Sequence, residues 1–176
     1  MARRYNQLRS RAKLSNEVEI RIIEQKIKSI EHCEENGEYF LKITTENGNR
    51  CKISEQDNDF IFNRWIWELV YDHLEEGDSI ELHTARGRIL RTKLNIMEGR
   101  GYLRNVEVTD DDVVLTIEED DVPDSIETIK KGSFTIVEDV GFNKNYISWL
   151  EIANYIDYKV HFSKICGRIV GILIPA

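Results

Sequence analysis

Two Asn-Gly dipeptides, at residues 36–37 and 47–48, constrain the fold of this 176-residue chain more than any other feature. Each lies between short runs of strand-forming residues, such as the run from Tyr39 to Thr44. A two-residue type I′ hairpin turn needs positive φ at both central residues, and Asn-Gly adopts this conformation at low cost. The sequence therefore predicts a three-stranded antiparallel meander over residues 17–54.

The first segment of this meander, residues 17–33, admits two interpretations. Four isoleucines recur in it at helical spacing, namely Ile20, Ile23, Ile27 and Ile30. The residues from Glu17 to Ile22 instead alternate between polar and apolar, as in a strand, and the adjacent Ile22 and Ile23 would then mark a bulge. We favour the bent strand over the helix because two hairpin signals follow it.

A helix is predicted next, over residues 58–76. The residues at 57–59 offer N-caps and Gly77 offers a stop. Apolar residues cover most of its circumference, including Trp65 and Trp67, so the helix must be covered on most sides. We expect it to plug a barrel or to lie under a second domain, and an exposed aromatic binding face is the alternative.

A second hairpin follows the helix, and the second half of the chain predicts a similar series of elements. The hairpin has strands over 78–84 and 88–96. The later expected elements are strands at 102–108, 113–117, 134–137, 157–165 and 168–174, an acidic connector over 118–132 and a helix over 145–156. In both halves a Trp-bearing helix precedes a hairpin whose turn contains Gly-Arg-Ile, at residues 87–89 and 167–169. This similarity raises the hypothesis of a duplication.

These elements predict a β-rich α+β protein with two tandem small β-barrel-like units. The order β-β-β-α-β-β is similar to that of the OB-fold, a five-stranded barrel that binds oligonucleotides or oligosaccharides. The similarity concerns element order and no sequence motif, so it implies a fold and cannot by itself assign a function. We expect a basic mobile arm over residues 1–15, a first unit over 16–98 and a second unit over 99–176.

Charge is sorted by position along the chain. Residues 1–13 hold five basic residues and no acid. Residues 83–104 hold six basic residues and one acid, a net of +5, whereas residues 105–139 hold two lysines and twelve acids, a net of −10. The formal charge of −8 argues against general affinity for nucleic acid. A local basic patch is still compatible with it, because salt screens each field within about 8–10 Å.

Basic and aromatic residues together predict binding of single-stranded nucleic acid. Arg and Lys bind phosphates, and aromatic stacking contributes roughly 1–3 kcal/mol per base. We therefore expect a non-enzymatic protein that binds single-stranded DNA or RNA through the arm and a basic hairpin over residues 86–104. The predicted contact residues are Arg3, Arg4, Arg9, Arg11, Lys13, Arg86, Arg88, Arg91, Lys93, Arg100, Tyr102 and Arg104. In a regular strand, Arg91 and Lys93 would share one face and Arg88 would lie on the other.

The alternative function is that of a structural or adaptor protein, or of an inhibitor that mimics nucleic acid. Such a protein would bind other proteins, or copies of itself, through its acidic and basic segments. The acidic runs at 110–112 and 118–121 could also hold a divalent cation. They lack the spacing of an EF-hand loop, so we predict no metal site.

Motifs for catalysis or cofactor binding are not found in the sequence. It contains no phosphate-binding loop and no nucleophile elbow. The four histidines lack metal-ligand spacing, and the odd count of three cysteines favours reduced thiols. No apolar run approaches the roughly 20 residues of a membrane span. We therefore expect no enzyme activity, no cofactor, no membrane partner and a cytoplasmic location.

Overall fold

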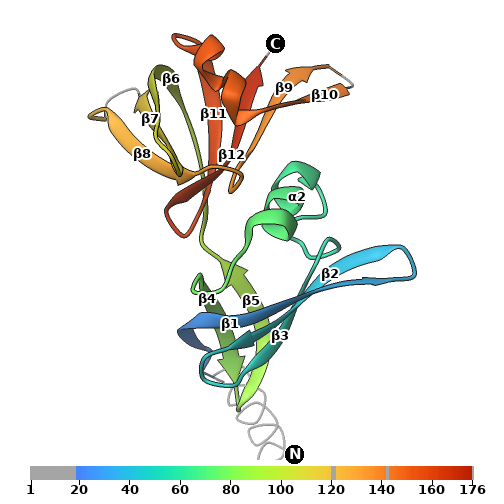
Figure 1. The fold of residues 1–176 in the computed structure, drawn as a ribbon. Coiled ribbons are helices and arrows are strands. Elements are labelled where there is room, and N and C mark those ends of the chain that lie inside the picture. The colour runs from blue at the N-terminus through green and yellow to red at the C-terminus, as the bar shows by residue number, and fades with distance from the viewer. Residues whose placement is uncertain (1–18, 120–121, 142, 176) are drawn as a thin grey trace, which may run out of the picture.

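The structure is a computed structural model that describes residues 19–119, 122–141 and 143–175. Strands make up 61% of it and helices 11%, which confirms the predicted β-rich α+β class. The strands form a five-stranded and a seven-stranded sheet, and the helix α2 (Arg64–His73) lies between them (Figure 1). The predicted basic arm lies outside the described residues.

The five-stranded sheet has the order β3-β2-β1-β4-β5, and all its neighbouring strands are antiparallel. Its strands are β1 (Arg21–Glu35), β2 (Glu38–Thr45), β3 (Arg50–Ser54), β4 (Ser79–Ala85) and β5 (Arg88–Leu94). The two edge strands, β3 and β5, lie against each other. The sheet therefore curls into a nearly closed, barrel-like form around a core of isoleucines and leucines.

The seven-stranded sheet has the order β10-β9-β12-β11-β6-β7-β8. Its strands are β6 (Ile96–Val108), β7 (Asp112–Glu118), β8 (Ser125–Lys130), β9 (Thr135–Val140), β10 (Asn143–Ile147), β11 (Lys159–Ile165) and β12 (Arg168–Pro175). Only the pairing of β12 with β9 is parallel among the described strands. Strand β8 also lies against β12, so this sheet curls as well.

Residues 21–35 form one long strand, which confirms the strand interpretation of this segment. Strand β1 pairs with β4 through residues 21–26 and with β2 from Ile27 onward. The bulge lies between Ile27 and Ser29, and the predicted position at Ile22 and Ile23 is wrong. It occurs where the strand changes its partner, so its position depends on tertiary pairing.

The two Asn-Gly turns differ in conformation. Asn36 and Gly37 have φ of 54° and 78°, as a type I′ turn requires. At the second turn Gly48 alone is left-handed, with φ of 83°, and its N–H donates to the carbonyl of Thr45. The N–H of Thr45 donates to the carbonyl of Asn49, so this is a longer hairpin loop and the predicted type I′ turn is wrong.

Helix α2 is shorter than the predicted helix over 58–76. Its N-cap is Asn63, whose side chain accepts a hydrogen bond of 3.2 Å from the backbone N–H of Ile66. The predicted caps at 57–59 lie in turns before the helix. Residues that can cap a helix occur at 57–59 and again at Asn63. Asn63 is the N-cap because the regular helix begins only after it.

Both sheets cover α2, as expected of such an apolar helix. Trp67 and Val70 are buried with the core of the five-stranded sheet. On the opposite side Gly171 of β12 lies directly against Leu69, since a Cβ atom on Gly171 would be 2.5 Å from Leu69 Cδ1. A glycine is therefore needed in β12 for the helix to pack this closely.

Two further predictions for the second half are wrong. The acidic connector over 118–132 contains strand β8, which pairs along its length with β7. The helix predicted over 145–156 is replaced by β10 and a short 3-10 helix, η1 (Trp149–Tyr155), which Ser148 caps by accepting a hydrogen bond from the N–H of Leu150. In both places a neighbouring strand edge provides backbone partners that local periodicity does not reveal.

The long strands β1 and β6 share a local hydrogen-bond pattern. Each carries a bulge where it passes from one partner strand to the next. In β1, Ile27 makes two backbone hydrogen bonds. Its carbonyl accepts from the N–H of Gly77, and its N–H donates to the carbonyl of Asp78. In the other sheet the same two bonds join Leu103 to Asp157 and Tyr158.

The hairpins β4–β5 and β11–β12 are also alike. All four residues of their turns have positive φ, namely Arg86 (51°), Gly87 (73°), Cys166 (50°) and Gly167 (82°). The third residue of each return strand is bulged out of the pairing, Leu90 in β5 and Val170 in β12. Their surroundings differ, because Val170 is fully buried in the core around α2 whereas Leu90 is 60% exposed.

Arg168 at the start of β12 joins the second sheet to the first. Its Nη2 atom donates to the carbonyl of His73 at 2.5 Å and to Asp78 Oδ2 at 3.0 Å, and its Nη1 atom donates to Asp78 Oδ1. Nearby, His73 Nε2 lies 2.6 Å from Thr135 Oγ1 of β9. Polar contacts therefore fix the C-terminal end of α2 to both β9 and β12.

Candidate nucleic-acid interface

The bulge in β5 places the predicted basic residues of this strand on one face. The extra residue is Leu90, because Ile89 and Arg91 pair with adjacent residues of β4. Arg88, Arg91 and Lys93 are consequently all exposed. The expectation that Arg88 lies on the opposite face is wrong, since a one-residue bulge reverses the alternation beyond it.

An open groove of about 590 Å³ lies between β3, β5 and the turn that follows β3. Arg50 and Lys52 enter it from β3 and Arg91 enters it from β5. Asp57 and Asp59 also line it, so three basic and two acidic residues leave a net charge of +1. Asp59 Oδ1 accepts a hydrogen bond of 3.0 Å from Arg91 Nη2, which holds the guanidinium at the wall of the groove.

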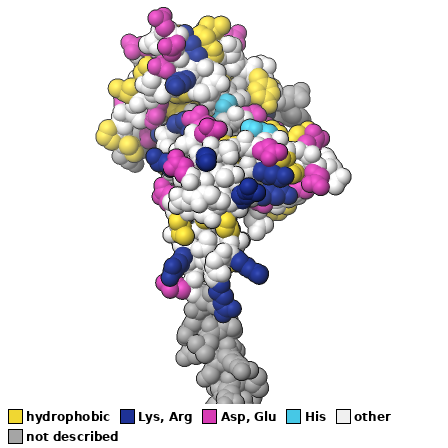
Figure 2. All heavy atoms as spheres, turned by 60° about the horizontal axis from the view of Figure 1, so that its bottom comes forward, with side chains coloured by type: hydrophobic (Ala, Val, Ile, Leu, Met, Phe, Trp, Pro, Cys, Tyr) yellow, Lys and Arg dark blue, Asp and Glu magenta, His cyan; other side chains and the backbone are white. Residues whose placement is uncertain are grey.

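Lysine side chains extend this basic surface onto β2. Lys42 and Lys52 face each other across the strand pair, and their Nζ atoms lie 6.0 and 4.2 Å from the ring centroid of Phe40. Both lysines are exposed, whereas Phe40 is buried beneath them. Figure 2 shows Lys and Arg side chains gathered on one flank of this face of the molecule, with acidic side chains at their border.

Sequence analysis missed Lys42, Arg50 and Lys52 as site residues. They are isolated basic residues in two separate strands, and only the pairing of β2 with β3 brings them together. The Asn-Gly signal indicated that the two strands pair, but a two-residue turn at 47–48 would place Lys42 opposite Ile53. Only the longer loop found in the structure places Lys42 opposite Lys52. Arg86, which was predicted, is exposed in the turn between β4 and β5.

Arg100, Tyr102 and Arg104 lie on β6, in the seven-stranded sheet. The predicted basic hairpin over 86–104 is therefore wrong, because β5 pairs with β4 while β6 pairs with β7 and β11. The pairing partners change at Asn95, between β5 and β6. Since β11 lies far along the chain, neighbouring residues could not reveal this pairing.

Two carboxylates bind Arg104. Its Nε atom donates to Glu118 Oε2 at 2.5 Å and its Nη1 atom to Asp157 Oδ1 at 2.9 Å. The hydrogen bond to Glu118, followed by that to Asp157, raises the pKa of the guanidinium. Its Cζ atom lies 4.9 Å from the ring centroid of Tyr102. The two acids neutralise Arg104, which leaves it less available to a phosphate group than an unpaired arginine.

A second pocket, of about 390 Å³, lies on β6 and β11 beside the start of α2. Trp65, Glu98, Arg100 and His161 are among the residues that line it. Burial and then the positive charge of Arg100 lower the pKa of His161, so its imidazole is neutral at pH 7. Arg100 is therefore the one cation of this lining and Glu98 its one anion, so the lining side chains have a net charge of zero.

Lys159 is a basic residue of this surface that sequence analysis missed. It is exposed on β11 and lies opposite Tyr102 of β6, a residue that is 37% exposed. Tyr102 is thus a surface residue with a lysine on one side and Arg104 on the other. Only the pairing of β6 with β11 places Lys159 there.

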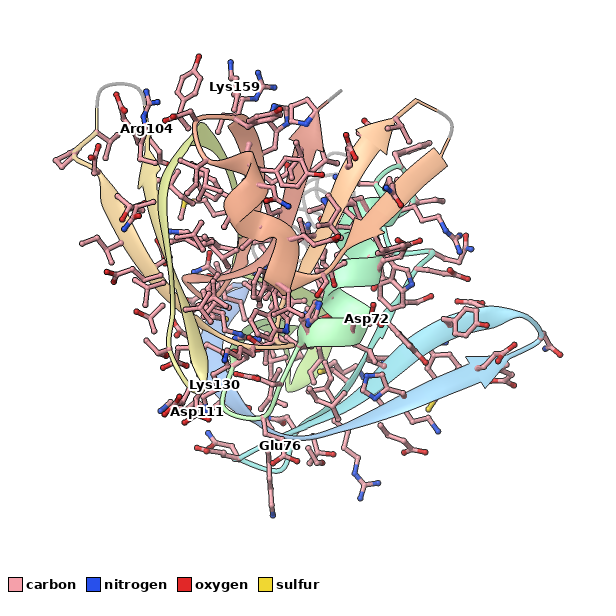
Figure 3. The ribbon with its side chains drawn as sticks, turned by 45° about the horizontal axis from the view of Figure 1, so that its top comes forward. Asp72, Glu76, Arg104, Asp111, Lys130 and Lys159 are labelled. Carbon is pink, nitrogen blue, oxygen red and sulfur yellow. The ribbon has the colours of Figure 1, made fainter. Side chains whose placement is uncertain are left out.

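Of the predicted acidic runs, Asp110 and Asp111 lie between β6 and β7, Asp112 and Glu118 are the end residues of β7, and residues 120–121 lie outside the described part of the chain. Figure 3 shows Asp111 and Lys130 beside each other, at the end of the sheet opposite Arg104 and Lys159. Lys131 Nζ donates to the carbonyl of Asp110 at 2.9 Å, so lysines contact this turn. Across the residues that the structure describes, no three His, Cys, Asp or Glu side chains are grouped to hold a metal ion.

Two of the cysteine thiols, Cys33 and Cys166, contact backbone carbonyl oxygens. The three cysteines are not joined in disulfides, and burial raises the pKa of Cys51 to about 11 and raises that of Cys166 as well. Both thiols are therefore protonated at neutral pH, and the thiolate is the nucleophilic form. His32 Nε2 lies 2.8 Å from the carbonyl of Tyr71, which connects β1 to the helix.

Among the described residues, no helix combines the length and the apolar character needed to cross a membrane. Protein-family models give no match to this chain, and a search of curated proteins gives no significant match either.

Proposed function

We propose that this protein binds single-stranded nucleic acid without catalysing a reaction, and that the groove between β3 and β5 is its main contact surface. The observation that carries the proposal is the convergence of Arg50, Lys52 and Arg91 from two edge strands on one open groove. Arginine and lysine side chains along a groove bind a phosphate backbone and release its counterions.

The connectivity supports a finer description of the fold as two tandem OB-like units that meet at Asn95. In the first sheet, three strands, a helix and two strands follow in that order, and the edge strands β3 and β5 close on each other. The second sheet repeats this pairing, with β6, β7, β8, β11 and β12 in the places of β1, β2, β3, β4 and β5. The hairpin β9–β10 is inserted before η1. The shared bulges, turns and hydrogen bonds favour a duplication.

This description agrees with the position of the groove. OB-folds bind oligonucleotides on their second and third strands and with the loops between strands one and two and strands four and five. Here β2 and β3 carry Lys42, Arg50 and Lys52, and the turn between β4 and β5 carries Arg86. We propose that the five basic residues of segment 1–13 add contacts to the same phosphate backbone.

The test is fluorescence anisotropy of labelled single-stranded DNA and RNA oligomers at several salt concentrations. We expect binding that weakens as salt rises, and we expect Lys52→Glu to weaken it further. Because one phosphate contact is lost, the slope of log K against log salt should fall by about 0.7. The matched control is Lys130→Glu, the same charge change at an exposed lysine beside the acidic turn.

Removal of residues 1–13 should also lower the affinity without changing the midpoint of urea unfolding. Equal effects of Lys52→Glu and Lys130→Glu would exclude the groove as the contact surface. Absence of binding at low salt, together with a molar mass that rises with protein concentration, would support the adaptor function and overturn nucleic-acid binding.

A further inference from the structure

Phe62 is an aromatic residue that belongs to neither core. Its side chain is 97% exposed, the largest exposed fraction among the large apolar residues that the structure describes. It lies on the segment that leads from the groove to helix α2. Residues 56–59 of this segment line the groove, and Trp65, three residues after Phe62, lines the second pocket. In chain order Phe62 therefore lies between residues that line the groove and a residue that lines the second pocket, and each of these surfaces carries an arginine.

Trp65, three residues further along the chain, adds a second aromatic ring. It is partly buried, and Lys144 Nζ of β10 lies 4.8 Å from its ring centroid. In the same pocket Arg100 is exposed on β6. Cations and aromatic rings in alternation are the combination that holds phosphates and unstacked bases of a single strand.

We propose that a single strand runs from the groove, across Phe62, to the pocket at Trp65 and Arg100, and that Phe62 stacks on one of its bases. This inference rests on the proposed function and deepens it, because it defines the ligand as a strand long enough to contact both sheets. A base can stack on Phe62 only when it is not paired within a duplex. The path therefore selects single strands over double-stranded nucleic acid.

The experiment compares oligothymidylates of about 4 and about 12 nucleotides, both within the range of site sizes for one OB-fold. Phe62→Ala should lower the affinity for the longer oligomer about tenfold, within the range of one base stack. It should leave the salt slope unchanged, because no phosphate contact is lost. Phe62→Tyr should keep the affinity of the unaltered protein, since it keeps the ring.

Arg100→Glu tests the far end of the path. It should reduce the salt slope for the longer oligomer by about 0.7 and have no effect on the shorter one. The matched control for Phe62 is Leu150→Ala, at an apolar residue of η1 that is 70% exposed. Circular dichroism and urea unfolding confirm that the variants fold, which is expected because both side chains lie in solvent.

The outcomes separate this inference from the proposed function. If Lys52→Glu weakens binding while Phe62→Ala and Leu150→Ala both leave it unchanged, the groove function stands and the path across Phe62 is overturned. Equal losses in Phe62→Ala and Leu150→Ala would likewise overturn the path, because the effect would not be specific to it. Absence of any salt-dependent binding by the unaltered protein overturns the proposed function, and the path with it.

Discussion

At the residue scale, His73 is the titratable group most closely tied to the packing of the helix. Its Nε2 atom contacts Thr135 Oγ1, and Arg168 binds its carbonyl oxygen. Burial lowers the pKa of the imidazole, and Arg168 lowers it further, while Asp72 and Glu75 oppose the shift. The neutral ring is therefore the form that the folded protein favours at pH 7.

This shift predicts a loss of stability in mild acid. In the unfolded chain the histidine pKa is about 6.5, so as pH falls through this value the unfolded state binds a proton before the folded state does. The free energy of unfolding should therefore decrease from pH 7 towards pH 5. His73→Gln should show a smaller decrease, because Gln can bond to Thr135 without titrating. Urea unfolding at a series of pH values measures both proteins, and identical pH profiles would contradict the assignment to His73.

At the element scale, the two bulged hairpins place corresponding residues in different surroundings. Val170 is buried between β12 and α2, whereas Leu90 at the corresponding position of β5 is exposed beside the groove. In both hairpins the bulged residue has no partner on the neighbouring strand. The contribution of its side chain to stability therefore depends on what packs against the hairpin.

A matched pair of substitutions measures this difference. Val170→Ala should lower the free energy of unfolding by about 2 kcal/mol, because it removes buried methyl groups and leaves a cavity under the helix. Leu90→Ala removes a larger side chain, yet it should change stability by less than about 0.5 kcal/mol because that side chain is largely in solvent. Urea unfolding of both variants provides the comparison. A greater loss for Leu90→Ala would show that the exposed bulge is covered in solution.

At the scale of the whole molecule, the interaction of Arg168 with Asp78 connects the two sheets. Asp78 is 6% exposed and also accepts a hydrogen bond of 2.9 Å from the N–H of Glu75. Its carboxylate has therefore lost most of its contact with water and depends on the guanidinium for compensation. An unpaired carboxylate at this position would be costly.

Removal of this arginine should destabilise the protein strongly. We expect Arg168→Ala to lower the free energy of unfolding by about 3 kcal/mol, because it leaves Asp78 buried without a cation. The control is Arg64→Ala, which breaks an exposed ion pair with Glu68 within α2 and should cost less than about 0.5 kcal/mol. Thermal and urea unfolding test both variants. Similar effects of the two changes would mean that Arg168 does not join the sheets.

Features that depend on neighbouring residues could be predicted from the sequence. The turn at Asn36-Gly37 forms as predicted because these two residues tolerate positive φ at low cost. The meander over β1, β2 and β3 follows from the strand-forming runs on either side of the turns. The apolar circumference of α2 correctly indicated a helix covered on several sides, because no such surface is stable in water.

Which strands pair, and where the pairing shifts, depends on contacts between distant parts of the chain. Strand β8 and the replacement of a helix by β10 and η1 depend on strand edges supplied by distant residues, and local periodicity carries no signal for them. The candidate site depends on the same information. The bulge at Leu90 unites Arg88, Arg91 and Lys93, and the closure of β3 on β5 forms the groove. Backbone preference acts over a few residues, whereas partner choice is settled by burial and hydrogen bonding across the whole chain.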